Sequence, residues 1–179
     1  LLIPSLWDNA HAKNLDEPGL LLYRSNLLGS DLRITNFGGG NTSAKVEMTD
    51  PLNRKPVEVL WVKGSGGDIA SMKLDGFATL YMDKLLALKG LYKDLSQEDE
   101  MVHNLNHCTF NLNPRAASID TCLHGYVPYA HVDHVHSDAV IAIAATHDVI
   151  SASSFHFIVA GTSENDVVAV AGPDPIAAV

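Results

Sequence analysis

HVDHVH, at residues 131–136, is the stretch of this sequence on which both the fold and the chemistry depend. Side chains of a β-strand alternate between the two faces of a sheet, so His134 and His136 are expected to share one face. Neutral imidazole is a common metal ligand, and a catalytic zinc site normally takes three protein ligands and keeps one position open. The pair therefore predicts half of a metal site. The alternative is two ordinary polar histidines at a strand end.

The sequence around this strand predicts interleaved helices and strands. Apolar residues at helical spacing indicate helices, and short apolar runs bounded by turn residues indicate strands. The expected helices cover residues 17–28, 78–92, 96–108, 121–126 and 138–145, and the expected strands cover residues 33–37, 44–48, 57–62 and 131–136. Two of these strands are joined by the turn-rich stretch TDPLNRKP, which suits a hairpin. The pattern is typical of a layered α/β fold.

The composition indicates a globular protein with one main core, because 46% of the 179 residues are hydrophobic. A formal net charge of -9 and a pI near 5.3, without a basic cluster, argue against a nucleic-acid-binding surface. Two cysteines predict no disulfide framework and favour the cytoplasm. No run of about 18 apolar residues and no signal-peptide pattern occur, so no membrane segment is expected.

Two glycine-rich loops, GGGNTS at residues 38–43 and KGSGG at residues 63–67, each follow an expected strand. Such loops expose backbone N–H groups that bind phosphate or carboxylate. The candidate amides are those of Gly39, Gly40, Gly64 and Gly66, and the short side chains that would orient the anion are Asn41, Ser43, Ser65 and Ser118. Neither loop matches the P-loop or the dinucleotide fingerprint. Ordinary hairpin turns are the alternative.

Asp120 lies fourteen residues before His134. A carboxylate near a metal can exchange protons with a substrate while the metal stabilises developing negative charge, which is enolate chemistry. Aspartate is also a preferred N-cap, and a helix is expected directly after Asp120, so both interpretations stay open. Asp133 is expected on the opposite strand face in a supporting role. His124 and His131 receive no assignment from the sequence.

Five segments carry a more specific signal: NLLGSDLRITNFGGGNTSAK, EVLWVKGSGGD, DGFATLYMDKL, HCTFNLNPRAASIDT and HVDHVHSDAVIAIAA. In this order they resemble the amino-terminal part of bacterial rhamnulose-1-phosphate aldolases of the large type. These enzymes belong to the class II aldolase/adducin superfamily and are usually fused to a carboxy-terminal short-chain dehydrogenase. The resemblance covers about residues 6–146.

The resemblance implies an α/β fold in three layers, with a central, largely antiparallel sheet flanked by helices, in a homo-oligomer with sites between subunits. It implies zinc-dependent retro-aldol cleavage of a ketose 1-phosphate into dihydroxyacetone phosphate and lactaldehyde. By motif, Asp120 falls on the acid/base carboxylate, and His134 and His136 fall on zinc ligands. The positions that hold the substrate phosphate are Gly40, Asn41, Ser65, Gly66 and Ser118.

The sequence departs from this family beyond residue 146. The family's third zinc histidine lies in a His-Gly segment well downstream of the pair, and residues 147–179 do not resemble that region. We therefore expect an incomplete aldolase-like domain at residues 1–146 and a foreign or discontinuous tail at residues 147–179. His156 is the candidate third ligand because it is expected on a strand, but its spacing from the pair differs from the family pattern. No dinucleotide fingerprint occurs in the 179 residues, so NAD is not an expected cofactor.

Other functions are also consistent with the sequence. Lys63 would serve as a Schiff-base amine in a second kind of aldolase, because a desolvated lysine beside a carbonyl site is nucleophilic. An adducin-like interaction module, or an inactive fragment of the bifunctional enzyme, would involve no catalysis. The intact pair His134 and His136 counts against the interaction module, which needs no metal ligands. The expected partner is a small sugar phosphate, with no nucleic acid and no membrane.

Overall fold

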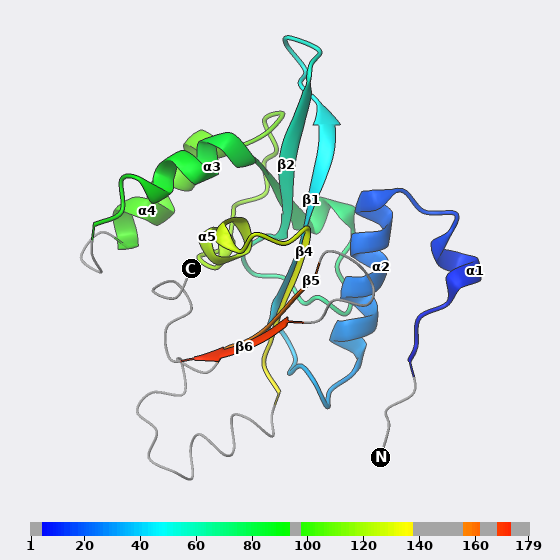
Figure 1. Cartoon of the computed structure of the whole chain (residues 1–179). Coiled ribbons are helices and arrows are strands. Elements are labelled where there is room, and N and C mark those ends of the chain that lie inside the picture. Colours follow the sequence, from blue (N-terminus) through cyan, green and yellow to red (C-terminus); the bar gives the residue numbers. More distant parts are fainter. Residues whose placement is uncertain (1–4, 94–97, 138–155, 162–167, 173–179) are drawn as a thin grey trace.

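The computed structural model describes residues 5–93, 98–137, 156–161 and 168–172. At its centre is an antiparallel sheet of six strands in the order β3-β2-β1-β4-β5-β6 (Figure 1). The strands are β1 (Asn41–Thr49), β2 (Pro56–Lys63), β3 (Phe77–Tyr81), β4 (His131–Val135), β5 (His156–Gly161) and β6 (Val168–Gly172). The predicted α/β fold with a largely antiparallel sheet is confirmed.

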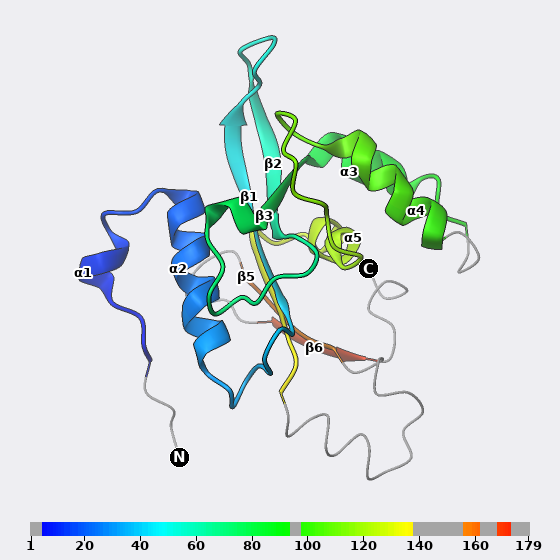
Figure 2. The same ribbon diagram turned by 180° about the vertical axis from the view of Figure 1, so that it is seen from behind.

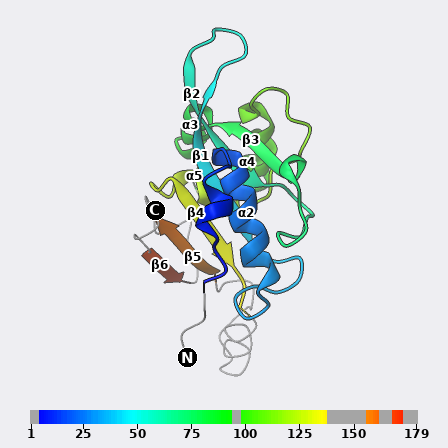
Figure 3. The same cartoon turned by 90° about the vertical axis from the view of Figure 1, so that its right-hand side faces the viewer.

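Helices flank the β1–β2 part of the sheet on both sides. They are α1 (Asn9–Ala12), α2 (Glu17–Ser30), η1 (Leu74–Gly76), α3 (Met82–Lys89), α4 (Glu98–Asn104), η3 (Leu105–Cys108) and α5 (Thr121–Tyr126). Figures 1 and 2 show α2 on one side of β1 and β2, and α3, α4 and α5 on the other. Strands β5 and β6 continue the sheet beyond β4 (Figure 3).

The two faces of the sheet bury separate clusters of apolar side chains because strand residues alternate between faces. On the α3 side, Leu60 and Val62 of β2 pack with Leu85 and other side chains of β3, α3, α4 and η3. On the α2 side, Leu21 packs with Ala44 of β1 and its neighbours on that face. The layers therefore follow from the alternation of apolar residues along β1 and β2.

Helix α2 begins where the sequence predicts and ends two residues later than the expected residue 28. The carboxylate of Asp16 accepts a hydrogen bond of 2.9 Å from the backbone N–H of Gly19, and a proline occupies the first turn. Both features favour helix initiation, since the first backbone N–H groups lack partners within the helix.

Gly29 allows α2 to approach the loop after β2. A Cβ built on Gly29 would lie 2.2 Å from the backbone nitrogen of Ala70 and 2.7 Å from the carbonyl carbon of Ile69. Gly29→Ala is expected to lower the free energy of unfolding by about 1–2 kcal/mol, because the overpacking exceeds the gain in helix propensity. Urea unfolding measures this change in the free energy of unfolding. In the control Gly90→Ala the nearest atom, the carbonyl oxygen of Ala87, lies at 3.4 Å. Equal stability of the two variants would contradict the prediction.

The prediction of a strand at residues 33–37 is wrong. The backbone N–H groups of Ile34 and Thr35 both donate to the carbonyl oxygen of Asp31, at 3.0 and 3.2 Å. The Asp31 carboxylate also binds Arg33 through its side chain and its backbone N–H. These local hydrogen bonds close a turn and compete with strand pairing. The segment is therefore a turn before Gly38, whose φ is +75°.

The helix predicted at residues 78–92 is correct only for its middle part. Residues 77–81 form β3, which pairs with β2, and the helix α3 covers Met82–Lys89. Leu85 and Leu88 are buried as their helical spacing predicted. Tyr81 matches that spacing by coincidence, because it closes the strand and donates a hydrogen bond of 2.8 Å to the carboxylate of Asp50. The pairing of β3 with β2 thus determined the structure of residues 77–81, against the helical spacing of the apolar residues.

The remaining predicted elements have mixed outcomes. The short helix at residues 121–126 is α5 with the same bounds, and the expected strands at residues 44–48, 57–62 and 131–136 correspond to β1, β2 and β4. The helix expected at residues 96–108 is α4 followed by the 3-10 helix η3. The helix expected at residues 138–145 lies outside the described residues. Among described helices, none is long and apolar enough to cross a membrane.

Candidate active site at the β1–β4 strand ends

The pairing of β1 with β4 brings Asn41 opposite His134. The sequence predicts Asn41 in a loop, but β1 begins at this position. The preceding Gly40 has a φ of +78°, and a Cβ there would lie 2.7 Å from the carbonyl oxygen of His134. Only glycine suits this backbone conformation and this close approach. The loop sequence therefore fixes how Asn41 enters the sheet beside His134, where both residues are buried.

Asp120 immediately precedes α5, and its carboxylate faces Asn41, Ser118 and His134. One oxygen, Oδ2, accepts hydrogen bonds from Asn41 Nδ2 at 2.6 Å and from Ser118 Oγ at 3.3 Å. The other, Oδ1, lies 3.8 Å from His134 Nδ1. The carboxylate makes no capping hydrogen bond to α5. The capping interpretation of Asp120 is thus not supported, whereas its placement beside the histidine pair agrees with a role in proton transfer.

His134 and His136 lie side by side, as the strand alternation predicted. Their ring centroids are 4.7 Å apart and the ring planes make an angle of 38°. His134 is 1% exposed and His136 is partly exposed. Among the residues that the structure describes, no group of three or more His, Cys, Asp or Glu side chains is arranged to hold a metal ion. The two imidazoles fit as part of a metal site that needs a further ligand.

His124, left without assignment by the sequence, lies behind the histidine pair. Its Nδ1 is 2.7 Å from Ser43 Oγ, and its ring centroid is 6.4 Å from that of His134. Burial, followed by the nearby cations Arg24 and Lys45, lowers the pKa of His124 to about 3. His124 is therefore neutral at pH 7 and supports the β1 strand through Ser43. Ser43 is buried and bonded to His124, which argues against its role as an anion ligand.

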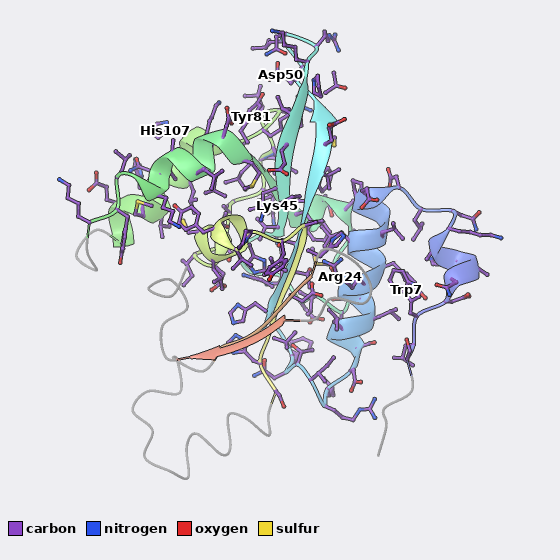
Figure 4. All side chains as sticks on the ribbon, viewed as in Figure 1. Trp7, Arg24, Lys45, Asp50, Tyr81 and His107 are labelled. Carbon is purple, nitrogen blue, oxygen red and sulfur yellow. The ribbon has the colours of Figure 1, made fainter. Side chains whose placement is uncertain are left out.

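The opposite face of β4 carries a separate polar network around Arg24 of α2, labelled in Figure 4. Arg24 Nε forms an ion pair of 3.0 Å with Asp133, and its Nη2 donates to the carbonyl oxygen of Ser43 at 2.8 Å. Its Nη1 lies 3.2 Å from His131 Nδ1. The supporting role predicted for Asp133 agrees with this geometry, because the network ties α2 to β1 and β4.

The glycine-rich loop after β2 lies against the segment that leads to Ser118. Ser65 donates its backbone N–H to the carbonyl oxygen of Ala116 at 3.0 Å. Two of the amides predicted to bind an anion already have partners, because Gly39 donates to Asn36 at 3.1 Å and Gly64 donates to Gly76 at 2.9 Å. The amides of Gly40 and Gly66 stay candidates for that role. Gly66 has a φ of +71° and is exposed.

Two cations, Lys63 and Arg115, lie beside this loop, and the sequence predicted a role only for Lys63. Lys63 is 5% exposed and donates from Nζ to Asn41 Oδ1 at 3.3 Å. Burial lowers the pKa of Lys63, with Asp120 acting in the opposite direction. Arg115 lies over the loop, since a Cβ built on Gly64 would be 2.6 Å from Arg115 Nε. The signal available in the sequence was a lone arginine in the small-residue segment that precedes Ser118.

The fold is that of a known protein family. The family model described as Class II Aldolase and Adducin N-terminal domain matches residues 21–175. The chain belongs to this family. The match crosses residue 146, and β5 and β6 pair with β4 in the same sheet. The division into a domain at residues 1–146 and a tail at residues 147–179 stays a prediction.

Two further proteins are similar to this chain. The solved N-terminal class II aldolase domain of a conserved protein from Thermoplasma acidophilum has a TM-score of 0.70 and 31% identity, with 85% of this chain and 68% of that chain covered. The relative named Uncharacterized oxidoreductase YuxG, from Bacillus subtilis (strain 168), is 44% identical over 144 residues. The alignment covers 79% of this chain and 20% of that relative, so the chain spans about a fifth of its length.

Family membership supports an aldolase-type function with a small-molecule substrate. Class II aldolases are typically metal-dependent, and the pair His134 and His136 is compatible with that chemistry.

Proposed function

We propose that this class II aldolase domain cleaves a ketose 1-phosphate similar to rhamnulose 1-phosphate into dihydroxyacetone phosphate and lactaldehyde, with zinc as cofactor. The observation that carries the proposal is the carboxylate of Asp120, held 3.8 Å from His134 by hydrogen bonds from Asn41 and Ser118. A carboxylate fixed beside two imidazoles combines a proton carrier with metal ligands. An adducin-like interaction module gives no reason for this arrangement.

His134 and His136 are the proposed zinc ligands, with His156 as the third. In the β4–β5 register Val135 pairs with Phe157. If this register continued one residue beyond the end of β4, it would bring the backbone of His156 opposite that of His136. This register supports the candidate that the sequence suggested. A zinc ion bound there would act as a Lewis acid that stabilises negative charge developing on the substrate oxygens.

Asp120 is the proposed proton carrier. Cleavage of the C3–C4 bond converts the C4 hydroxyl group into an aldehyde and leaves an electron pair on C3, so one proton leaves the hydroxyl group and one reaches C3. Because Asn41 and Ser118 bind Oδ2, the other oxygen, Oδ1, is directed toward the histidine pair. An ionised carboxylate in this position exchanges protons with a substrate held next to it.

The phosphate of the substrate is proposed to bind where the two glycine-rich loops meet the segment before α5. The proposed ligands are Gly40, Asn41, Ser65, Gly66 and Ser118. Asn41 and Ser118 are also bonded to each other at 2.7 Å, so phosphate binding and the orientation of Asp120 share residues. We further propose a cytoplasmic homo-oligomer in which this domain forms the amino-terminal part of a bifunctional aldolase/dehydrogenase.

Release of dihydroxyacetone phosphate from rhamnulose 1-phosphate tests the proposed function. The chain supplied with zinc is expected to release it, and removal of zinc by a chelator is expected to abolish at least 90% of the rate, on the order of the tenfold effect of losing 1.4 kcal/mol of transition-state stabilisation. Adding zinc back restores the rate. No release at any zinc concentration would contradict the proposal.

Borohydride treatment separates this mechanism from one that uses Lys63 as a Schiff-base amine. Reduction of a Schiff base would attach the substrate to Lys63 irreversibly. We expect no covalent product, because the Lys63 amine is bonded to Asn41 and the proposed chemistry depends on the metal. Trapping of one substrate per chain, with a rate insensitive to chelator, would establish the alternative.

A further inference from the structure

The β1–β2 hairpin projects beyond the helices, and its outer part, residues 47–58, is called the hairpin end (Figures 1 and 3). The carboxylate of the buried Asp50 braces the turn. It accepts hydrogen bonds of 2.9 Å from the backbone N–H groups of Leu52 and Asn53, and one of 2.8 Å from the Tyr81 hydroxyl group. A turn held in this way loses little conformational freedom on binding. The hairpin end is therefore pre-organised for contact with another molecule.

Charged side chains of opposite sign occupy two separate places on the hairpin end. Arg54 and Lys55 are exposed at the turn, and Glu47 and Glu58 are exposed on the strands. The two glutamates lie directly opposite each other in the β1–β2 register, so they share one face of the hairpin. Like charges in this arrangement repel each other and destabilise the pairing. An opposite charge placed over them would remove this repulsion.

The described part of the chain does not supply that charge as an ion pair. Its three ion pairs involve Arg24, Arg33 and His134, and none of the four charged residues of the hairpin end. Burial lowers the pKa of Lys45, and Glu58 acts on it in the opposite direction. The Lys45 ammonium group donates instead to two backbone carbonyl oxygens of the segment after α5.

The spacing of the charges is self-complementary. Only the pairs Met48–Val57 and Thr49–Pro56 separate the glutamates from the turn, a distance of roughly 7 Å at about 3.4 Å per residue. A twofold axis between the two places brings the basic turn of one hairpin onto the glutamates of a second. The reciprocal contact then forms at the same time, because a twofold interface uses the same surface on both copies.

Other kinds of partner fit this surface less well. Nucleic acid or an anionic membrane would attract Arg54 and Lys55 but would be repelled by Glu47 and Glu58 and by the formal net charge of -9. The same net charge opposes the approach of two copies at long range. Physiological salt screens that repulsion beyond about 8 Å, whereas charge pairs in direct contact persist.

We propose that the hairpin end is a self-association surface on which a second copy of this chain docks in a twofold arrangement. Arg54 and Lys55 of each copy face Glu47 and Glu58 of the other. Contact also removes from water part of Leu52, which is 91% exposed at the turn. The inference goes beyond the proposed function, because the hairpin end holds none of the residues proposed for catalysis, zinc or phosphate.

Sedimentation velocity of the full chain over a range of protein concentrations tests the proposal. A contact between two hairpin ends is smaller than a standard interface of about 1,600 Å², so we expect a dimer with a dissociation constant on the order of 1–100 μM. Two double variants reverse the charges: Arg54→Glu with Lys55→Glu, and Glu47→Lys with Glu58→Lys. Each is expected to raise the dissociation constant at least tenfold, about 1.4 kcal/mol, because every substitution acts twice in a symmetric dimer.

The matched control is Lys13→Glu with Lys73→Glu. It changes the net charge by the same amount as the reversed turn, but at exposed residues outside the hairpin end. Its dissociation constant should stay close to that of the parent. A loss of association in this control as large as in the reversed turn would assign the effect to overall repulsion and overturn the inference.

Mixing the two reversed variants gives the sharpest result. In a mixed pair, acidic turns meet basic strands and basic turns meet acidic strands, so both contacts are restored. The mixture is expected to associate about as tightly as the parent, whereas neither variant associates alone. A parent that stays monomeric, or a mixture that associates no better than its components, would overturn the inference.

Two further measurements on the same samples keep the outcomes separate. Thermal unfolding shows whether each variant is folded, and if the strand variant is not, the reversed turn and its control decide the question. Release of dihydroxyacetone phosphate tests the proposed function independently. Charge-dependent dimers without any cleavage would retain the self-association surface and reject the aldolase activity, whereas cleavage by a parent that never associates would do the opposite.

Discussion

Replacing Asp120 by Asn is expected to lower turnover of the ketose 1-phosphate by about 10²–10⁴-fold, the usual contribution of general acid–base catalysis. This range corresponds to about 2.7–5.4 kcal/mol of transition-state stabilisation. The amide keeps the shape of the carboxylate and can still accept the hydrogen bond that Asn41 donates. It lacks the negative charge and cannot carry the proton between C4 and C3.

Folding should change little in Asp120→Asn, because the carboxylate makes no capping hydrogen bond to α5. Thermal unfolding and zinc content, compared with the parent, check that the loss of turnover comes from the chemical step and not from misfolding or loss of zinc. The matched control is Asp83→Asn, in which an exposed carboxylate of α3 accepts a hydrogen bond of 2.7 Å from the backbone N–H of Lys84. Turnover of Asp120→Asn within about twofold of the parent would leave Asp120 as a structural residue and the proton carrier unidentified.

The part of this site that the sequence predicted lies on regular structure. The period of two along β4 placed His134 and His136 on one face, and the apolar residues of β1 and β2 placed the neighbouring strands. Both inferences need only local backbone geometry. The helix expected at residues 121–126, directly after Asp120, is α5 with the same bounds.

The missed parts depend on contacts between distant segments. The register of β1 with β4, which sets Asn41 opposite His134, has no signature within either strand. Arg115 lies against Gly64 although the two residues belong to different irregular segments, which an isolated bridge between Gly64 and Ala117 joins. Side-chain hydrogen bonds between Asp31 and Arg33 also form a turn where the sequence predicted a strand at residues 33–37. Periodicity carries no information on any of these.

Replacing His134 by Ala is expected to weaken zinc binding by at least about 10²-fold. Loss of a residue that only orients a ligand typically costs 10–100-fold in metal affinity, and loss of a ligand itself should exceed that. Zinc per chain after dialysis against a competing chelator measures the effect without reference to activity. His136→Ala should show a comparable loss, since the two rings are adjacent, with centroids 4.7 Å apart.

The two variants differ in a useful way, because His134 is buried and His136 is partly exposed. A cavity at His134 could lower stability by itself, whereas His136→Ala leaves the packed interior intact, so a shared loss of zinc identifies ligation as the cause. His107→Ala is the control, because His107 is exposed and lies on the α4 side of the molecule (Figure 4). His156→Ala tests the third ligand that the β4–β5 register suggests. Zinc content equal to the parent in both His134→Ala and His136→Ala would exclude the metal site, whereas retention in His156→Ala alone would move the third ligand elsewhere.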